Sequence, residues 1–248
     1  MDTLWKREYT LRGSDFDRYN CIKPAAVLDL FQDAAAQHAQ ELGVGFEDML
    51  RRGYLWVLTR VKFKILKAPK SYQRVIAKTW PLAPNRLNYR REYCVEDLKG
   101  EQLMIGSSEW VVIDNVKRRF LSVPDLYPFS SGFYPEVMLE GKLCKIKDFT
   151  AAEPAYTVDA GFCDLDLNGH VNNTKYANYV LNAIHPTGPL PLKTFQIDYR
   201  KEVVLGTRLH LFYEKGESGF LAKGQNQNGE IMFACRLECD FVNPGSTN

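Results

Sequence analysis

The sequence predicts an α+β protein that is built twice in tandem, each half an antiparallel sheet wrapped around one long helix. An amphipathic helical segment is followed by segments of alternating hydrophobicity, and this order recurs in the second half of the chain. Short motifs also recur at matching places in the two halves. A chain of 248 residues is long enough for one large domain or two small ones.

Composition limits the classes of function. Hydrophobic residues make up 45% of the chain and charged residues 25%, as in ordinary globular proteins. Apolar runs are only a few residues long, and "MDTLWKREYT" does not resemble a secretory signal. Six cysteines form no CxxC pair and no zinc-like spacing with the four histidines, and the net charge is only +2. We therefore expect a cytoplasmic protein with reduced thiols, no membrane span, no nucleic-acid partner, no metal and no cofactor.

The first half begins with a helix from about Pro24 to Leu42. Proline suits a first helical turn, and Gly43 suits the position just past the end. An apolar stripe at helical spacing consists of Val27, Leu28, Phe31, Ala34, Ala35, His38 and Leu42. The next segment, "YLWVLTRVKFKIL", alternates at period two, and further alternating runs cover residues 75–80, 87–95 and 103–113. One helix followed by a meander of strands is the predicted order.

The second half repeats this order. Asn172 or Asn173 can cap a helix whose apolar stripe is Tyr176, Tyr179, Val180, Ala183 and Ile184. Alternating strands follow over residues 195–199, 209–213 and 231–241. The motif "DFDRYN" (15–20) matches "DLDLNG" (164–169), "RVKFK" (60–64) matches "QIDYR" (196–200), and "LKGEQLM" (98–104) matches "QNGEIMF" (227–233). We predict units over residues 1–120 and 155–248, joined by a linker over 121–154 that shows no strong period.

The stretch "DLDLNGHVNN", from Asp164 to Asn173, is unusually polar. As structural elements, its acids complement a helix start, Gly169 makes a tight turn, and the last two asparagines cap the helix. Only the second copy carries this set, however, because where it has "NGHVNN" the first copy has "NCIKPA". That asymmetry favours a catalytic site.

The residue types in this stretch suit hydrolysis. Asp166, Asn168 and His170 place a carboxylate, an amide and an imidazole just before a helix, whose free N–H groups can stabilise an oxyanion. The chain has no G-x-S-x-G elbow, no H-E-x-x-H and no phosphate-binding glycine loop. The other histidines, at 38, 185 and 210, have no ligand-like spacing, so metal catalysis is not predicted.

At this point the sequence resembles a known family. "DLDLNGHVNNTKYANYV" is similar to the signature of the acyl-acyl carrier protein thioesterases, and the likeness extends through "LWVLTRVKFKILKAP", "KTWPLAPNRLNYRREYCVED" and "FQIDYRKEV". The resemblance is to a bacterial member with two hotdog units in tandem. It implies hydrolysis of a long-chain acyl thioester, carried on the phosphopantetheine arm of acyl carrier protein, to free fatty acid. This reaction ends chain elongation.

The resemblance also implies a set of catalytic residues. It assigns Asp166, Asn168 and His170, and it adds Glu202 of "YRKE", which by itself is typical of a solvated acid at a strand end. Plant members have a cysteine directly after this glutamate, but Val203 stands there, so a cysteine mechanism at that position is excluded. The first half is expected to hold the acyl chain.

Alternatives remain open at this stage. Coenzyme A could replace the carrier, the fold could serve a non-catalytic acyl-thioester sensor, and a hotdog dehydratase is a further alternative. The basic runs "KFKILKAPKSYQR", "NRLNYRREY" and "VKRRF" are either solvated strand faces or a docking face for an acidic carrier. A homodimer, the acyl chain length and the choice between Asp166 and water as nucleophile are also open.

Overall fold

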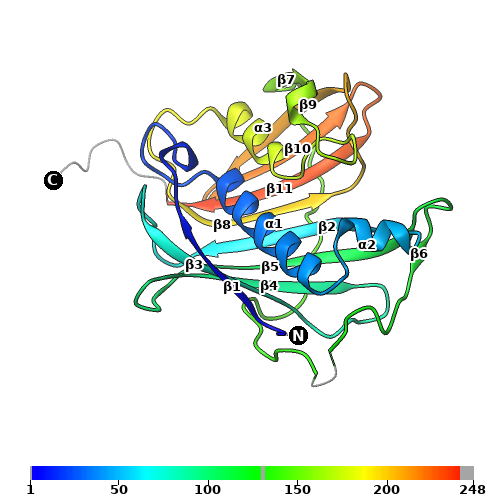
Figure 1. The fold of residues 1–248 in the computed structure, drawn as a ribbon. Helices are drawn as coiled ribbons and strands as arrows, with labels where there is room; N and C mark the ends of the chain where they lie inside the picture. The colour runs from blue at the N-terminus through cyan, green and yellow to red at the C-terminus, as the bar shows by residue number, and fades with distance from the viewer. Residues whose placement is uncertain (1, 130–131, 241–248) are drawn as a thin grey trace. The chain divides into compact units, whose positions relative to one another are not determined.

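The computed structural model describes residues 2–129 and 132–240. The chain divides into two compact units (Figure 1). Unit 1 comprises Met1–Leu11, Asp29–Lys67 and Tyr72–Leu143, and unit 2 comprises Arg12–Leu28, Ala68–Ser71 and Cys144–Asn248. Phe241 of the last expected strand, and Ser130 and Ser131 of the expected linker, lie outside the described residues. In the described part of the chain, each helix is too short or too polar to span a bilayer.

Unit 1 contains an antiparallel sheet with the spatial order β1-β3-β4-β5-β2, and a short strand, β6, pairs with β5. The strands are β1 (Trp5–Thr10), β2 (Tyr54–Ile65), β3 (Arg74–Pro81), β4 (Tyr89–Asp97), β5 (Gln102–Asp114) and β6 (Phe120–Leu121). Helix α1 (Pro24–Glu41) begins in unit 2 and continues into unit 1, where a short helix, α2 (Phe46–Arg51), follows it. The predicted helix and meander are confirmed.

Unit 2 repeats this architecture. Its sheet has the order β7-β9-β10-β11-β8, with antiparallel neighbours. The elements are β7 (Tyr156–Asp159), α3 (Lys175–Ile184), β8 (Leu192–Tyr199), β9 (Arg208–Gly216), β10 (Gly219–Asn226) and β11 (Ile231–Cys239). Single 3-10 turns, η1 (Gly13–Asp15) and η2 (Phe162–Asp164), precede α1 and α3. The predicted α+β fold, with an antiparallel sheet and a helix in each hotdog unit, is confirmed.

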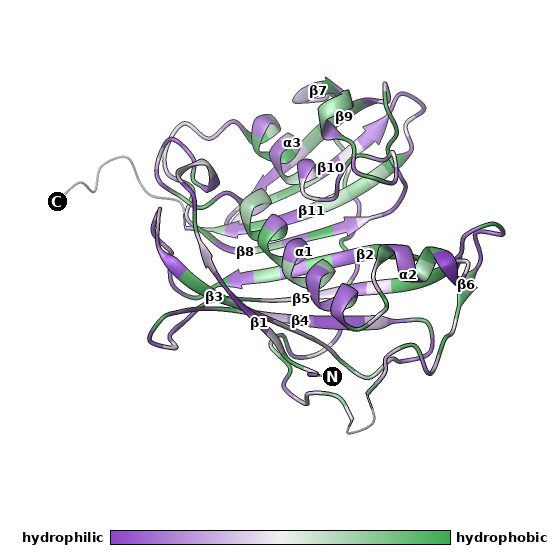
Figure 2. Cartoon of the chain, viewed as in Figure 1, coloured by the Kyte–Doolittle hydropathy of each residue, from purple (hydrophilic) through white to green (hydrophobic). Residues whose placement is uncertain are grey.

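Aromatic rings fill the space between helix and sheet. In unit 1, Phe31 of α1 stacks on Tyr93 with ring centroids 4.2 Å apart, and Gly106 makes room because a Cβ there would lie 2.2 Å from the Phe31 ring. In unit 2, Tyr176 of α3 meets Tyr199 and Phe233 edge to face. Hydrophobic and polar residues alternate along the helices and strands that carry these rings (Figure 2). Each predicted apolar stripe is therefore the buried face of its helix.

The histidine in the α1 stripe is buried and neutral. Arg91 can only donate, so its Nη1, 3.1 Å from His38 Nδ1, makes that ring nitrogen the acceptor. His38 Nε2 then carries the proton and donates to the carbonyl oxygen of Asp2 at 3.1 Å. Burial, followed by the charge of Arg91, lowers the pKa of His38 from 6.5 to about 4.

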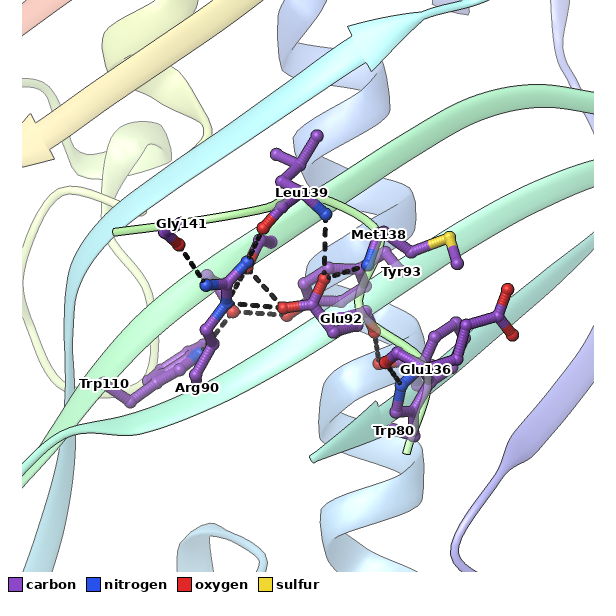
Figure 3. A network of polar contacts seen from close by, with 12 residues as sticks. Trp80, Arg90, Glu92, Tyr93, Trp110, Glu136, Met138, Leu139 and Gly141 are labelled. Atoms are coloured by element: carbon purple, nitrogen blue, oxygen red, sulfur yellow. Dashed lines mark hydrogen bonds and ion pairs between the residues drawn. The ribbon is translucent and has the colours of Figure 1, made fainter. Parts of the chain in front are cut away.

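The first part of the linker is bound to the outer face of the unit 1 sheet (Figure 3). The Glu92 carboxylate is fully buried and accepts from Met138 N–H at 2.8 Å, from Ser107 Oγ at 2.7 Å and from Arg90 Nε at 2.6 Å. Arg90 also donates to the carbonyl oxygens of Leu139 and Gly141. Side chains of the sheet thus satisfy the backbone of a segment that has no secondary structure of its own.

The last part of the linker is bound to unit 2 in the same way. Gln196 Nε2 donates to the carbonyl oxygen of Cys144 at 2.7 Å, and the Asp198 carboxylate accepts from Ile146 N–H at 2.7 Å. Arg200 donates to the carbonyl oxygen of Ile146 at 2.9 Å. All three side chains come from β8 or the residue after it.

In one of the basic runs, two arginines lie neither on a solvated face nor on a docking face, whereas Arg86 of the same run is exposed. In "NRLNYRREY", Arg90 binds Glu92 and linker carbonyls, and Arg91 is buried against His38 and Thr79. Neither guanidinium is presented to a partner. In "KFKILKAPK", Lys64 is exposed.

Removing Glu92 tests the linker contacts. Glu92→Ala leaves Arg90 without its carboxylate and two linker N–H groups without an acceptor, so we expect a loss of about 3–5 kcal/mol in the free energy of unfolding. Urea unfolding measures it. Glu101→Ala, which breaks the exposed pair with Lys67, is the control and is expected to leave stability nearly unchanged. Equal, small losses in both variants would contradict a structural role for the Glu92 cluster.

The buried histidine predicts a pH dependence of stability. Because the folded-state pKa of His38 is about 4 and its ordinary value is 6.5, its contribution is complete above pH 6.5 and is lost as the pH falls towards 4. The loss is about 3 kcal/mol. The free energy of unfolding, measured in urea between pH 7 and pH 4, should change less steeply with pH in His38→Gln than in the wild type. If the free energy of unfolding depends on pH equally in both proteins, His38 is not the group responsible.

Candidate active site

The polar stretch forms a self-braced loop in unit 2. Asp164 Oδ2 accepts from Gly161 N–H at 2.9 Å and closes the η2 turn. Asp166 Oδ1 accepts from Asn168 N–H at 2.8 Å, and Asp166 N–H donates to the carbonyl oxygen of His170 at 2.8 Å. Gly169, at φ +75°, adopts the left-handed conformation that this turn requires. The acids therefore hold the loop together through backbone groups.

Residues 202–204, which follow β8, pair with this loop and bring Glu202 close to His170. His170 forms an antiparallel bridge with Val204, and Val171 N–H donates to the carbonyl oxygen of Val203 at 2.8 Å. His170 Nε2 then lies 3.4 Å from Glu202 Oε2. The two side chains are 29% and 44% exposed, so a substrate can reach them.

The remaining predicted residues lie around this pair. Asp166 is half-buried, and its N–H bond to the carbonyl oxygen of His170 places it on the same turn as the imidazole. Asn168 is exposed at the tip of the turn. The structure therefore brings Asp166, His170 and Glu202 into one site and places Asn168 at its rim.

The start of α3 differs in detail from the prediction. The N-cap residue is Thr174, not Asn172 or Asn173. Asn172 Oδ1 instead accepts from the backbone N–H and the hydroxyl of Thr174, both at 3.0 Å. The carbonyl oxygen of Asn173 accepts from Tyr199 Oη at 2.8 Å. Both asparagines thus support the helix start, but from positions before the N-cap and not as the N-cap itself.

The first copy of the chain, before the linker, forms the same loop with the same two bonds at its acid. Asp17 Oδ1 accepts from Tyr19 N–H at 2.8 Å, and Asp17 N–H donates to the carbonyl oxygen of Cys21 at 2.9 Å. Asn20, at φ 60°, takes the place of the turn glycine. The equivalent of "NGHVNN" is therefore "YNCIKP", one residue earlier than the predicted "NCIKPA".

The segment carrying Glu202 also has an equivalent. In each copy, two consecutive backbone N–H groups donate to one carbonyl oxygen. The N–H groups of Arg200 and Lys201 donate to Met232 O. Those of Leu66 and Lys67 donate to Leu103 O. Ala68 is thus the equivalent of Glu202. The predicted match of "RVKFK" with "QIDYR" is wrong by two residues, because Ile65 pairs with Met104 as Tyr199 pairs with Phe233.

The two loops share their acids but not their chemistry. Asp15 and Asp17 make the contacts that Asp164 and Asp166 make. The functional groups change at three places, where Tyr19, Cys21 and Ala68 stand for Asn168, His170 and Glu202. The bracing by the acids is therefore common structure, and the imidazole–carboxylate pair belongs to the second copy.

Other chemistry near the loop is limited. Cys163 is exposed on η2, whereas Val203, beside Glu202, is fully buried. Within residues 2–129 and 132–240, no group of His, Cys, Asp and Glu side chains is arranged to hold a metal ion.

Comparisons with known proteins identify the family of the chain. Residues 2–128 match the model of the acyl-ACP thioesterase N-terminal domain, and residues 150–243 match that of the C-terminal domain, ACP being acyl carrier protein. The chain is 28% identical over 215 residues to the chloroplastic palmitoyl-acyl carrier protein thioesterase of Arabidopsis thaliana, covering 80% of this chain and 52% of that protein. It spans about half the length of the curated relatives it matches.

Solved structures share the fold. An acyl-ACP thioesterase from Bacteroides thetaiotaomicron superposes with a TM-score of 0.88 at 22% identity, over 96% of this chain and 98% of that one. The 12:0-ACP thioesterase of Umbellularia californica gives a TM-score of 0.84 at 22% identity, over 97% and 98%. Both family models match in chain order and together cover most of the sequence. The chain belongs to the acyl-ACP thioesterase family.

Proposed function

We propose that the protein hydrolyses the thioester of an acyl group carried by acyl carrier protein and releases a free fatty acid, which ends chain elongation. The observation that supports this most directly is the accessible His170–Glu202 pair on an acid-braced loop, in a chain of this family. The names of the relatives refer to acyl carrier protein and to different acyl groups. We therefore assign the carrier as partner and leave the chain length open.

The proposed chemistry uses one water molecule. His170, oriented by Glu202, takes a proton from water as its oxygen attacks the thioester carbonyl carbon. The C–S bond then breaks, and the departing phosphopantetheine sulfur receives the proton from His170. Asp166 holds the loop that carries His170, and Asn168 at the rim would bind the substrate or the water. We take water as the nucleophile because His170 and Glu202 form an accessible acid–base pair that can activate it, whereas Asp166 Oδ1 braces the loop.

The first half is proposed to hold the acyl chain. Its apolar cluster contains Leu42, Val44, Met49, Tyr89, Val112 and Leu126, with further aromatic rings packed against it. The division into residues 1–120, 121–154 and 155–248, the cytoplasmic location and a homodimer stay predictions.

Variants of the pair test the chemistry. Glu202→Gln keeps the size of the side chain and removes its charge, and His170→Ala removes the proton carrier. We expect each to lower kcat on an acyl-ACP substrate by about 100-fold or more, the usual effect of losing a positioned acid–base group. Cys163→Ala, a matched change on the same loop, is expected to keep near-full activity. An active Glu202→Gln beside a folded, inactive Cys163→Ala would instead indicate a thiol enzyme.

The choice of carrier is tested by comparing substrates. We expect kcat/KM to be higher for acyl-ACP than for the coenzyme A thioester of the same acyl group. If exposed cations such as Lys64 contribute to docking, added salt should raise KM for acyl-ACP more than for a neutral small thioester. Lys64→Glu should have the same effect, whereas Lys99→Glu on the β4–β5 turn serves as the control. A higher kcat/KM for the coenzyme A thioester would make acyl-coenzyme A the substrate in place of acyl-ACP. Binding of acyl-ACP without hydrolysis would indicate a sensor.

A further inference from the structure

Exposed apolar side chains gather beside the His170–Glu202 pair. Within residues 144–240, the exposed large hydrophobic side chains are those of Phe162, Leu167, Val204 and Leu205, which are 81%, 94%, 50% and 56% exposed. Two of them lie on η2 and on the turn before the imidazole, and the other two directly follow the segment that carries the carboxylate. We call these four residues the apolar patch.

Backbone pairing places Val204 on the same face as the proposed catalytic groups. His170 and Val204 are directly opposite each other in an antiparallel bridge, and side chains at opposite positions lie on one face. The next pair, Val171 and Val203, is joined by an N–H bond of 2.8 Å to a carbonyl oxygen and is buried on the other face. Glu202 precedes Val204 by two residues and so shares its face. The pair therefore opens onto a surface that Val204 lines.

The other three residues of the patch lie on backbone that is bonded to this surface. Gly206 N–H donates to the carbonyl oxygen of Ala160 at 2.9 Å, which joins the chain just after Leu205 to the chain just before Phe162. Leu167 lies in the turn that carries the imidazole, with almost its whole side chain in solvent. The patch thus comes from two stretches of chain that hydrogen bonds hold together.

The first copy of the chain provides an internal comparison. Its Tyr72 N–H donates to the carbonyl oxygen of Leu11 at 2.8 Å, which repeats the bond between Gly206 and Ala160. By this register, and by that of the acids, the equivalents of the patch residues are Gly13, Arg18, Lys70 and Ser71. The same loop therefore folds with small or polar residues at all four positions. The exposed apolar side chains occur only in the copy that has the imidazole–carboxylate pair.

Such a concentration of exposed apolar residues marks a binding surface, whereas single ones are ordinary. The charges beside it nearly cancel, because the acids Asp164, Asp166 and Glu202 stand against the bases Arg200 and Lys201. Attraction between opposite net charges is therefore weak here. A partner of this surface is bound by burial of apolar area.

The proposed substrate places one macromolecule at this surface. A thioester carried by acyl carrier protein reaches His170 only when the carrier stands at the opening of the site. An extended acyl chain or pantetheine arm touches one side of a projecting side chain such as Leu167. A protein surface can cover such a side chain completely, as in the buried centre of an interface.

We propose that the apolar patch is a docking surface for acyl carrier protein, which covers it with apolar side chains around the attachment point of its phosphopantetheine arm. The proposal rests on the thioesterase function proposed above. Coenzyme A carries the same arm but no protein that could cover the patch. The patch is therefore a determinant of the preference for the carrier over coenzyme A.

The double variant Leu167→Gln, Leu205→Ser tests the proposal without adding charge. The serine is the residue of the first copy, and both positions are exposed, so Tm should stay close to that of the wild type. We expect KM for acyl-ACP to rise about tenfold, which corresponds to about 1.4 kcal/mol, with kcat at saturation unchanged. The kcat/KM for the coenzyme A thioester of the same acyl group should stay within about twofold. Because the contact is apolar, the rise in KM should persist at high salt.

Val116→Gln is the matched control, since Val116 is 85% exposed on the turn between β5 and β6. It should change neither substrate's kcat/KM. If the double variant keeps the wild-type KM for acyl-ACP, the patch does not dock the carrier. An equal rise of KM for both thioesters would assign the patch to the acyl chain or the arm, and conversion of a wild-type dimer to monomers would make it a subunit contact; either result overturns the proposal. A wild type that hydrolyses neither thioester would instead overturn the proposed function.

Discussion

The site depends on a short stretch of backbone pairing between two segments that are far apart in the sequence. His170 bridges Val204, and Val171 donates to Val203 O. The relative position of the imidazole and the Glu202 carboxylate is therefore set by main-chain hydrogen bonds before either side chain makes a contact. Such pairing costs entropy once, during folding, and leaves the two groups that we propose as catalytic already close when a substrate arrives.

The duplicated loop separates scaffold from chemistry. Asp17 braces the first-copy loop as Asp166 braces the second, although Cys21 and Ala68 stand where the pair would be. Asp17 therefore serves the structure of its loop, since no imidazole–carboxylate pair stands beside it. Asp166 consequently has a structural task that an alanine substitution would also remove, so a dead Asp166→Ala would not by itself identify a nucleophile.

Periodicity was enough to predict the helices, the strands and their repetition, because each element buries one face. It could not supply the register between the copies, since a shift of two residues leaves a period-two pattern unchanged. Charge patterning likewise failed for Arg90 and Arg91, because a run of basic residues looks the same whether its partners are solvent or a buried Glu92 and His38.

The candidate site was predicted in parts. Spacing in the chain placed Asp166, Asn168 and His170 on one loop before a helix, and the turn geometry agrees with that. Glu202 came only from the family resemblance, since local sequence cannot show that its segment pairs with the loop. Tyr176 was predicted as core. It is core, and its ring packs edge to face on Tyr199 and Phe233.

The linker shows no hydrophobic periodicity because it is bound through its backbone, and this binding also restrains the strand that leads to the candidate site. Its backbone groups are satisfied by side chains of the sheets, so its own residues need not alternate. In unit 2 these side chains are Gln196, Asp198 and Arg200, which lie on β8 or just after it. The same strand leads into Glu202. Binding of the linker therefore restrains the outer face of the strand end that delivers the carboxylate, while Tyr199 on this strand packs against Tyr176. The residues that lead into Glu202 are thus fixed on one face by the linker and on the other by Tyr176, which is the support that a partly exposed carboxylate needs if it is to act in catalysis from one position.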